Sequence, residues 1–464
     1  MPVSMFARLD AKNEACRGYL RGEVGNDALQ HRERPGRGVC HTHNEIEETP
    51  MKTPKKLLCT LLYCLPLGLA ATAQAEEISF WARAADAGFV EPLVKAWNDK
   101  HPDKVALTVI PNDDFVTKLG TAIAGGAAPD VIAIDLIFVP AFAEAGQLMD
   151  IGAEAKALPY YKSLSQSHLR LAESKGKQYA VPFSAEGSVL LYNKKLFKQA
   201  GLDPEKAPQT WADVEAAAKK ITALGKGTKG FYFSGACGGC NIFTLTPYIW
   251  AAGGDVLTPD GKKETLNNPQ LKSVLSMYRR MWEGGNMPSG VKTDNGANFI
   301  NAFTTGKIGI VGSGAFAIGL LKKDHPEIDF GLTYLPGEKA GQWSSFAGGD
   351  SIAIPAGSKH KKQAWDFISW SLSEEVQVEQ FAKNGSIPVR EDLATNAYSK
   401  LDNRYIVAST AMAKGRTPYT TKFNQLFNDP NGPWLAMIQE AVFGKGVEPA
   451  IKDAQARFDQ ILKQ

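Results

Sequence analysis

The residues best spaced for chemistry are Cys237 and Cys240, which enclose two glycines. A Cys-x-x-Cys pair can form a disulfide, a redox-active dithiol or half of a zinc site. The glycines allow the tight turn that a bridge between near neighbours needs, and an oxidising compartment favours the bridge. A redox pair normally opens a helix in a small thioredoxin-like domain, and zinc needs two more ligands; neither is present nearby. We therefore predict a disulfide, with a redox pair and a free thiol pair as alternatives.

No familiar catalytic motif accompanies this pair. The chain has no Gly-x-Ser-x-Gly nucleophile turn, His-Glu-x-x-His metal motif or phosphate loop. The histidines after residue 75 are dispersed in polar settings: His101, His168, His325 and His360. We expect a protein that is not an enzyme and uses no cofactor or metal. A secreted glycosidase, which would also use two carboxylates and aromatic platforms, is the enzymatic alternative.

Residues 51–75 have the pattern of a secretory signal peptide. A basic start at Met51 leads into an apolar segment over residues 57–71, and Ala73-Gln74-Ala75 forms a small-x-small cleavage site. The apolar segment is shorter than the roughly 20 residues that span a bilayer. We therefore expect a cleaved signal rather than a membrane anchor.

Lipid attachment is not expected, because neither Cys59 nor Cys64 follows a small residue. The prediction is a soluble protein in the periplasm of a Gram-negative cell. Since an export signal must stand near the true N-terminus, residues 1–50 are expected to be an upstream segment outside the folded protein. The cluster Cys40-His41-Thr42-His43 lies in that segment, so we expect no metal site there.

The remaining residues, 76–464, are too many for one ordinary core, so two domains are expected. The formal net charge of the whole chain is only +3. This balance indicates no basic face for nucleic acid or for an anionic membrane. No segment after residue 75 is apolar enough to cross a membrane.

Apolar periodicity indicates an α/β protein. Strands and helices alternate in the first part, with strands at residues 78–81, 105–110 and 131–134 and helices at 89–101 and 113–124. This order predicts a mainly parallel sheet covered by helices. Thr210 is a predicted N-cap for the helix that follows it, and a Gly-rich loop leads into a strand at residues 351–354. Helices are expected to dominate the end of the chain, at residues 363–372, 374–383, 433–444 and 448–462.

Short motifs then occur along the chain in a set order: Pro129-Asp130-Val131-Ile132, residues 142–150, Val181-Pro182-Phe183, residues 191–197, Pro208-Gln209-Thr210-Trp211, Ala251-Ala252-Gly253-Gly254, residues 303–307 and residues 385–390. Together, behind a signal peptide, they resemble the extracellular solute-binding proteins of carbohydrate ABC importers, family 1, the maltose-binding-protein type. The resemblance covers residues 76–464. It implies the two-lobed periplasmic binding protein fold (type II), with a mainly parallel sheet and flanking helices in each lobe and a cleft between them that closes by a hinge motion.

The resemblance also implies lobe boundaries and a function. The expected first lobe comprises residues 76–187 and about 340–390, and the second residues 188–339 and 391–464. The implied function is periplasmic capture of a sugar or polyol by a monomer that delivers it to an inner-membrane ABC permease. The alternative is the same fold with a non-sugar solute, such as a polyamine or an organic anion. An anion binder prefers paired arginines in the cleft, for which only Arg83 and Arg390 are candidates.

Four carboxylates are implied to face that cleft, because ligands of open α/β sheets bind beyond the carboxyl ends of the strands. Asp86 follows the first strand, Asp135 ends the third, Glu186 stands seven residues before Asn193, and Asp350 ends a Gly-rich loop. Carboxylates accept hydrogen bonds from sugar hydroxyls, and few polar groups should stay unpaired once water is expelled. Glu186 has an alternative role as a hinge carboxylate paired with Lys or Arg.

Five further residues complete the predicted ligand site. Gly349 would let a backbone amide approach the ligand. Phe316 belongs to Gly314-Ala315-Phe316, which resembles a cleft-lining turn of the family, and Trp434 approximates a tryptophan that stacks on the sugar. Thr246 aligns with a tryptophan of maltose-binding protein, a departure that favours a sugar other than maltose. Arg390 is either a ligand contact or part of an ion pair between the lobes.

Overall fold

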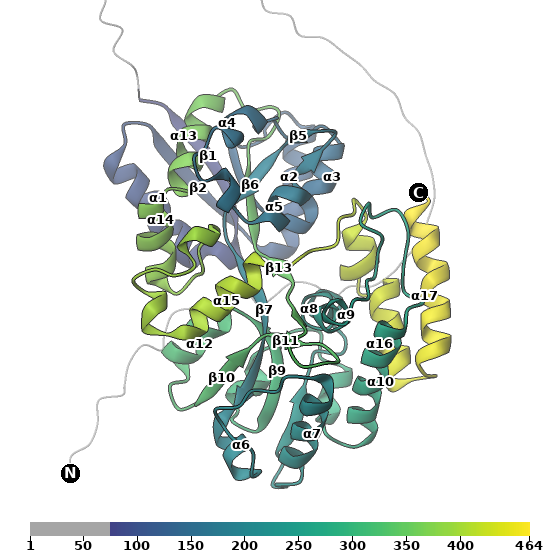
Figure 1. Ribbon diagram of the computed structural model, residues 1–464. Coiled ribbons are helices and arrows are strands. Elements are labelled where there is room, and N and C mark those ends of the chain that lie inside the picture. The colour runs from purple at the N-terminus through teal and green to yellow at the C-terminus, as the bar shows by residue number, and fades with distance from the viewer. Residues whose placement is uncertain (1–74) are drawn as a thin grey trace, which may run out of the picture. The chain divides into compact units, whose positions relative to one another are not determined.

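The structure, a computed structural model, describes residues 75–464. The predicted upstream segment, signal peptide and Cys40-His41-Thr42-His43 cluster lie outside the described residues. Within them, two sheets each carry a layer of helices (Figure 1). No helix of this described part is both long and apolar enough to cross a membrane.

The first sheet has the strand order β2-β1-β3-β14-β6. Its strands are β1 (Glu77–Arg83), β2 (Lys104–Ile110), β3 (Val131–Asp135), β6 (Ala180–Pro182) and β14 (Asp350–Ala353). β1 is parallel to β2 and β3, whereas β14 is antiparallel to both of its neighbours. Alternate residues of β1, namely Ile78, Phe80 and Ala82, are buried, as the period of a strand requires.

Helices and short strands complete this first lobe. They are α1 (Ala87–Lys100), α2 (Asn112–Ala124), α3 (Val139–Glu144), α4 (Gly152–Lys156), α5 (Gln166–Leu171), β4 (Glu173–Ser174), β5 (Lys177–Gln178), α13 (Lys361–Ser371) and α14 (Glu374–Val376). α1 and α13 meet on the sheet through aromatic side chains. Phe367 lies edge-on to both Phe80 and Trp97, at centroid distances of 5.4 Å. Residues far apart in the sequence therefore share one core.

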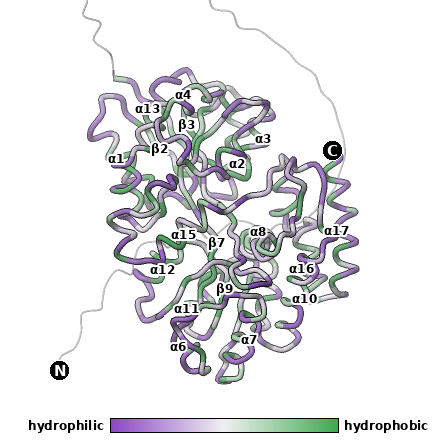
Figure 2. The backbone as a smooth tube through the Cα atoms, in the orientation of Figure 1, coloured by the Kyte–Doolittle hydropathy of each residue, from purple (hydrophilic) through white to green (hydrophobic). Residues whose placement is uncertain are grey.

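The second sheet has the order β10-β7-β9-β8, with β13 paired to the start of β7. The strands of this second lobe are β7 (Glu186–Asn193), β8 (Lys229–Tyr232), β9 (Ile308–Gly314), β10 (Phe330–Thr333), β11 (Leu335–Pro336), β12 (Trp343–Ser344) and β13 (Ala347–Gly348). β7 is antiparallel to β10 and β9, whereas β8 is parallel to β9. Each of the two sheets is therefore parallel apart from one reversed strand, β14 in the first and β7 in the second. Figure 2 shows hydrophobic residues concentrated along central strands such as β7 and β9.

The helices of the second lobe are α6 (Lys194–Gln199), α7 (Trp211–Thr222), α8 (Gly238–Thr244), α9 (Thr246–Ala251), α10 (Pro269–Glu283), α11 (Asn301–Thr304), α12 (Phe316–Asp324), α15 (Asn403–Ala413), α16 (Pro433–Phe443) and α17 (Val447–Leu462). α7 begins as its sequence predicts, because the Thr210 side chain accepts a hydrogen bond from the Asp213 amide at 3.1 Å. The helix predicted at residues 374–383 differs in winding. After α14 it continues as a π-helical turn, Gln377–Phe381, and a 3-10 turn, Ala382–Asn384.

Two of the crossings between the lobes run from strand to strand at adjacent places, and a third leads from the 3-10 turn Ala382–Asn384 to α15. β6 leads through residues 183–185 into β7, and β13 leads through Gly349 into β14. The crossings are tied together, since Gly348 pairs with Glu186 in the ladder between β13 and β7. Gly349 has a φ of +111°, and a Cβ atom there would overlap the carbonyl oxygen of Ser184. Only glycine fits this close approach of the two backbones.

The predicted lobe boundaries stay a prediction, because the described residues form one compact unit. The sheet pairing nevertheless locates the second crossing at Gly349. β12 lies inside the range 340–390 expected for the first lobe, yet it pairs with β11.

Candidate ligand-binding cleft

A cavity of about 1520 Å³ lies where the two lobes meet. Its walls come from the ends of β1 and β3, from both crossing segments, and from the starts of α8 and α12. Residues 421–425 add a further wall from the second lobe. The carboxyl ends of β1 and β3 meet at the same edge of the first sheet, which is where open α/β sheets bind ligands.

Arg83, the last residue of β1, organises the charged wall of the cleft. Its Nε donates to Asp350 Oδ2 at 2.8 Å, its Nη2 bonds the other oxygen of that carboxylate, and its Nη1 lies 3.3 Å from Asp135 Oδ2. Asp350 is fully buried at the start of β14, directly opposite Asp135 in the ladder to β3. Burial alone would raise the pKa of Asp350, but the charge and hydrogen bonds of Arg83 hold that pKa below its usual range.

The negative charges of Asp135 and Asp86 are less well compensated by a cation and by hydrogen bonds than that of Asp350. Burial raises the pKa of Asp135 to about 6, although Arg83 opposes the shift. Asp86 is 5% exposed; its Oδ1 accepts a long 3.4 Å bond from Ser184 Oγ, and its Oδ2 has no partner among the described residues. Burial and the negative charge of Asp350 raise the pKa of Asp86 well above its usual range. Asp86 lines the cavity, but its Oδ2 atom is shielded from solvent, and burial next to the negative charge of Asp350 favours the protonated acid.

Glu186 begins β7 on the crossing itself. Its Oε2 accepts a hydrogen bond from the backbone N–H of Phe316, the first residue of α12, at 3.3 Å. Burial raises the pKa of Glu186 to about 8, and the amides of Phe316 and Ala315 only partly oppose that shift. No Lys or Arg is paired with Glu186 among the described residues. The alternative role of Glu186, in a hinge ion pair, therefore has no partner here.

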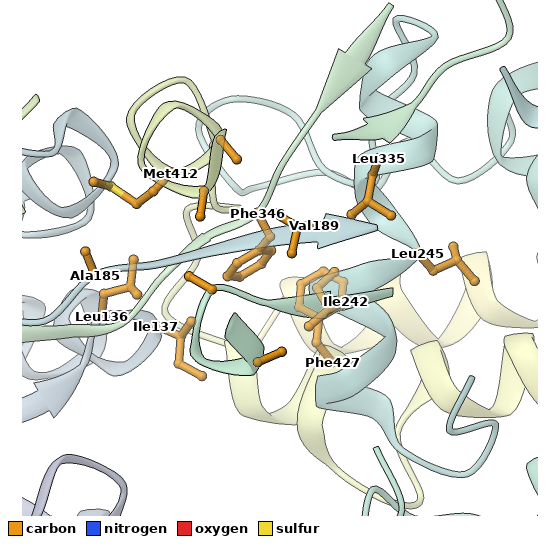
Figure 3. Packing of buried hydrophobic residues seen from close by; sticks show 14 of the residues in the cluster. Leu136, Ile137, Ala185, Val189, Ile242, Leu245, Leu335, Phe346, Met412 and Phe427 are labelled. Carbon is orange, nitrogen blue, oxygen red and sulfur yellow. The ribbon is translucent and has the colours of Figure 1, made fainter. Parts of the chain in front are cut away.

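Phenylalanine rings supply the apolar part of the cleft. Phe316 is 39% exposed, one of the few large hydrophobic side chains of the described chain that is this open. It stacks on Phe299 at a centroid distance of 6.3 Å. Figure 3 shows Ile137, Ala185, Ile242 and Phe346 in the hydrophobic cluster beside the cleft.

Several lining residues were not predicted from the sequence. Three are half-buried rings, and the others carry side-chain amides: Phe89, Phe138, Phe243, Asn112, Asn295, Asn384, Asn424 and Asn428. A signal for Phe89 and Phe138 was present, because each lies three residues beyond a predicted cleft carboxylate. The amides had no comparable signal, since they come from separate loops.

The structure contains the predicted disulfide between Cys237 and Cys240, with a Cα–Cα distance of 5.3 Å. Cys237 is the N-cap of α8, and its sulfur accepts a hydrogen bond from the Cys240 amide at 3.0 Å. Cys237, Gly238 and Gly239 line the cavity. The bridge is therefore part of the cleft wall.

Of the nine predicted ligand residues, the structure brings six together. Asp86, Asp135, Glu186, Phe316 and Gly349 line the cavity, and Asp350 lies directly behind it, bonded to Arg83. A ligand role for these six stays a prediction.

The other three predictions, Thr246, Arg390 and Trp434, need correction, because none of these residues lines the cavity. Thr246 is fully buried and donates to the Ile242 carbonyl at 2.6 Å. Trp434 is fully buried against Phe427, at a centroid distance of 5.7 Å.

Arg390 is 6% exposed and bonds Asp392, and its guanidinium lies 4.0 Å from the centroid of Tyr160. Its nearest bonded carboxylate is two residues away in the chain, so the pair is local. Arg390 therefore contacts neither the cavity nor a carboxylate of the second sheet.

The family of the chain follows from sequence comparison. The profile of the bacterial extracellular solute-binding proteins matches residues 82–378, which is more than half of the chain. The chain therefore belongs to this family of binding proteins.

Individual relatives are more distant. A putative binding protein of Brucella abortus is 27% identical, over 86% of this chain and 96% of the relative. The diacetylchitobiose binding protein of Streptomyces coelicolor is also 27% identical, over 80% of this chain and 86% of the relative.

Solved structures share the fold. An ABC transporter solute-binding protein of Thermotoga lettingae, bound with α-D-tagatose, superposes with a TM-score of 0.73 at 24% identity, covering 84% of this chain and 100% of the other. A cyclic α-maltosyl-1,6-maltose binding protein of Arthrobacter globiformis has a TM-score of 0.72 at 26% identity, covering 84% and 99%. These likenesses confirm the predicted two-lobed α/β fold.

Proposed function

We propose that this protein is the sugar-binding component of an ABC importer. It captures a neutral carbohydrate or polyol in the cleft, closes around it by hinge motion and delivers it to an inner-membrane permease. The family membership supports the binding role. The relatives whose names include a sugar, diacetylchitobiose and a cyclic maltosyl-maltose, support the ligand class.

One observation carries the proposal: hydrogen-bonding carboxyl groups and open phenyl rings share one cavity. Asp86, Asp135 and Glu186 supply the carboxyl groups, and Phe316 supplies the most open ring. A sugar needs both, because its rim carries hydroxyls and its faces carry C–H groups that pack on aromatic rings. A protonated carboxyl group can donate as well as accept, so raised pKa values suit an uncharged, hydroxyl-rich ligand.

The charges of the cleft argue against an organic anion. Arg83 is already bonded to Asp350 and Asp135. Arg390 lies outside the cavity, so the two arginines do not form a pair there. Lys422 is the other cationic lining residue, whereas three lining residues carry carboxyl groups: Asp86, Asp135 and Glu186. A polyamine fits this charge better than an anion does, so it is the competitor that the experiment must include.

The cavity also has room for more than one sugar ring. Its volume of about 1520 Å³ exceeds the roughly 300–1,000 Å³ of common small-molecule pockets. The screen should therefore extend from monosaccharides to tetrasaccharides.

A thermal-shift screen tests the ligand class. The panel contains D-tagatose, maltose, mannobiose, diacetylchitobiose and longer oligosaccharides, with spermidine and citrate as the non-sugar arms. We expect one carbohydrate to raise the melting temperature, by an amount that grows with its concentration. A shift with spermidine or citrate and none with any carbohydrate would overturn the proposed ligand class.

Binding without turnover, a periplasmic location and a monomeric state belong to the same proposal. Incubation of the protein with the stabilising oligosaccharide should leave the oligosaccharide intact by product analysis. Cell fractionation should recover the protein in the periplasmic fraction, and light scattering should give the mass of one chain. Any catalytic cleavage of the sugar would favour the glycosidase alternative instead.

A further inference from the structure

We propose that the disulfide between Cys237 and Cys240 is a positioning element of the ligand site. It holds three separate segments of the second lobe in the arrangement that receives the ligand. The proposed sugar-binding function supplies the ligand for one arm of its test. The arrangement itself is a property of the described chain and is tested separately.

The first segment is the loop that carries the bridge. Both cysteines are half-buried, and Cys237 faces the cavity. The Ala236 amide donates to the Asp294 carbonyl at 2.9 Å, and the Asn241 side chain donates to the carbonyls of Ser234 and Cys237 at 2.9 and 2.8 Å. The loop is thus fixed at its two ends, with the bridge between them.

The second segment surrounds Gly296, which lies directly on the two sulfur atoms. Gly296 has a φ of +107°, and a Cβ atom there would lie 3.0 Å from Cys240 Sγ and 3.1 Å from Cys237 Sγ. The neighbouring Asn295 lines the cavity. Asp294 anchors the other side, since its carboxylate accepts hydrogen bonds from Tyr232 and Ser234 at 2.7 and 2.6 Å.

The third segment is the π-helical turn Asn424–Asn428. A Cβ atom at Gly238 would overlap the Phe427 carbonyl oxygen, and one at Gly239 would lie 3.0 Å from Asn428 Oδ1. The glycines between the cysteines therefore let this turn pack against the bridged loop. Asn424, Gln425 and Asn428 line the cavity from this turn.

The bridge therefore lies between two segments that present amide side chains to the cleft. Breaking the S–S bond allows the sulfur atoms to move apart to non-bonded contact. Because Gly296 lies against both atoms, that movement must be accommodated by residues 294–298 or by the loop itself. Freed amide side chains must then be ordered again when the ligand binds, and this lowers affinity.

Hydrogen exchange of the full chain, with and without tris(2-carboxyethyl)phosphine, tests the arrangement. The phosphine is oxidised to its oxide with an oxygen atom from water; two electrons cleave the S–S bond, and each sulfur takes up a proton. We expect faster exchange in residues 236–241, 294–298 and 424–428 and unchanged exchange in the first sheet. Cysteines before residue 76 also meet the reductant, so the control is Cys237→Ser/Cys240→Ser, which should exchange fast in these segments under both conditions.

The second measurement is the affinity for the carbohydrate of the panel above that stabilises the oxidised protein most. Reduction should weaken its binding about tenfold, as expected when several wall side chains must be ordered on binding. Gly296→Ala keeps the bridge but places a methyl group against both sulfur atoms, and it should weaken binding in the oxidised protein too.

Each result is decisive for one proposal. Unchanged exchange in the three segments after complete reduction would overturn the positioning role, even if a sugar binds. Faster exchange in the three segments, with no carbohydrate binding to the oxidised protein, would overturn the sugar proposal and leave the positioning role standing. Equal affinity of the oxidised and reduced forms for a bound sugar would overturn the link between bridge and ligand.

Discussion

At the scale of single residues, the cleft carboxyl groups differ in the charges that compensate them. Asp350 has a buried guanidinium bonded to both of its oxygens. Glu186 has only backbone amides, of which the Phe316 N–H lies 3.3 Å from its Oε2. The first arrangement stabilises a carboxylate, and the second favours the protonated acid. One crossing region thus holds a permanent ion pair beside groups whose charge depends on pH and on the ligand.

Glu186→Gln should change how stability depends on pH. The pKa of Glu186 is about 8 in the folded protein and near its usual value of about 4.3 when unfolded. Between about pH 4 and pH 8, Glu186 therefore binds more protons in the folded state than in the unfolded state. The stability of the wild-type protein falls as the pH rises through this interval. Urea denaturation from pH 4 to 9 should show the variant gaining stability relative to wild type across it. Equal slopes for the two proteins would contradict the raised pKa; Asp366→Asn, at an exposed Lys362 pair, is the control.

Arg83→Met should be strongly destabilising, because it leaves the fully buried Asp350 without its cation. Breaking one side of a buried ion pair costs about 3–5 kcal/mol. The loss should shrink at low pH, where Asp350 can be protonated. The matched control is Arg280→Met, which breaks a surface pair with Glu215 and should cost at most about 1 kcal/mol. Similar losses for the two variants in urea denaturation at pH 7 would argue against the buried pair.

Sequence reasoning located the residues that follow strands better than those on helices. Asp86 and Asp135 were predictable because the carboxyl ends of parallel strands meet at one edge of a sheet. Asp350, the first residue of β14, was instead predicted from the Gly-rich loop before it. The predicted places of Thr246 and Trp434 in the cleft were wrong, because the face that a helical side chain presents depends on tertiary packing. Both side chains are buried. The disulfide between Cys237 and Cys240 was predictable because the two cysteines are only three residues apart.

At the scale of elements, the periodic helices and strands were predictable and the crossings were not. β2 and α17 follow the apolar pattern of their own sequence closely. The position of the second crossing depends on the pairing of β13 with β7 and on the contact of Gly349 with Ser184. Such contacts join residues far apart in the sequence, and no local pattern specifies them.

Gly349→Ala tests the second crossing. The φ of +111° and the overlap with the Ser184 carbonyl oxygen should together cost about 3 kcal/mol or more. Gly357→Ala is the control, since a Cβ atom at Gly357 meets nothing within 4 Å. It should change the free energy of unfolding by at most about 0.5 kcal/mol. If denaturation shows both variants to be equally stable, the crossing is not as tight as described.

At the scale of the whole molecule, the cleft borders two sheets that are connected by paired crossings. A ligand that contacts Asp135 and Phe316 together must contact both lobes, because these residues belong to different sheets or their helices. Binding therefore favours a closed arrangement through contacts that an open one lacks.

Small-angle scattering should detect this closure. We expect the radius of gyration to decrease when the stabilising carbohydrate is added to the wild-type protein. Glu186→Ala/Asp135→Ala at the same sugar concentration should show a smaller decrease, because fewer molecules are occupied. A wild-type radius that stays constant at saturating sugar would exclude hinge closure as the mode of capture.

Calorimetric titration tests directly whether the ligand lies in this cleft. The stabilising carbohydrate is titrated into the wild-type protein, into Glu186→Ala/Asp135→Ala, and into the exposed control Asp366→Ala. We expect one site per wild-type chain and an unchanged affinity for the control. Loss of two hydrogen-bonding carboxyl groups should weaken binding at least about tenfold in the double variant, at about 1 kcal/mol or more for each bond. Equal affinities for all three proteins would show that the sugar binds elsewhere than in this cleft.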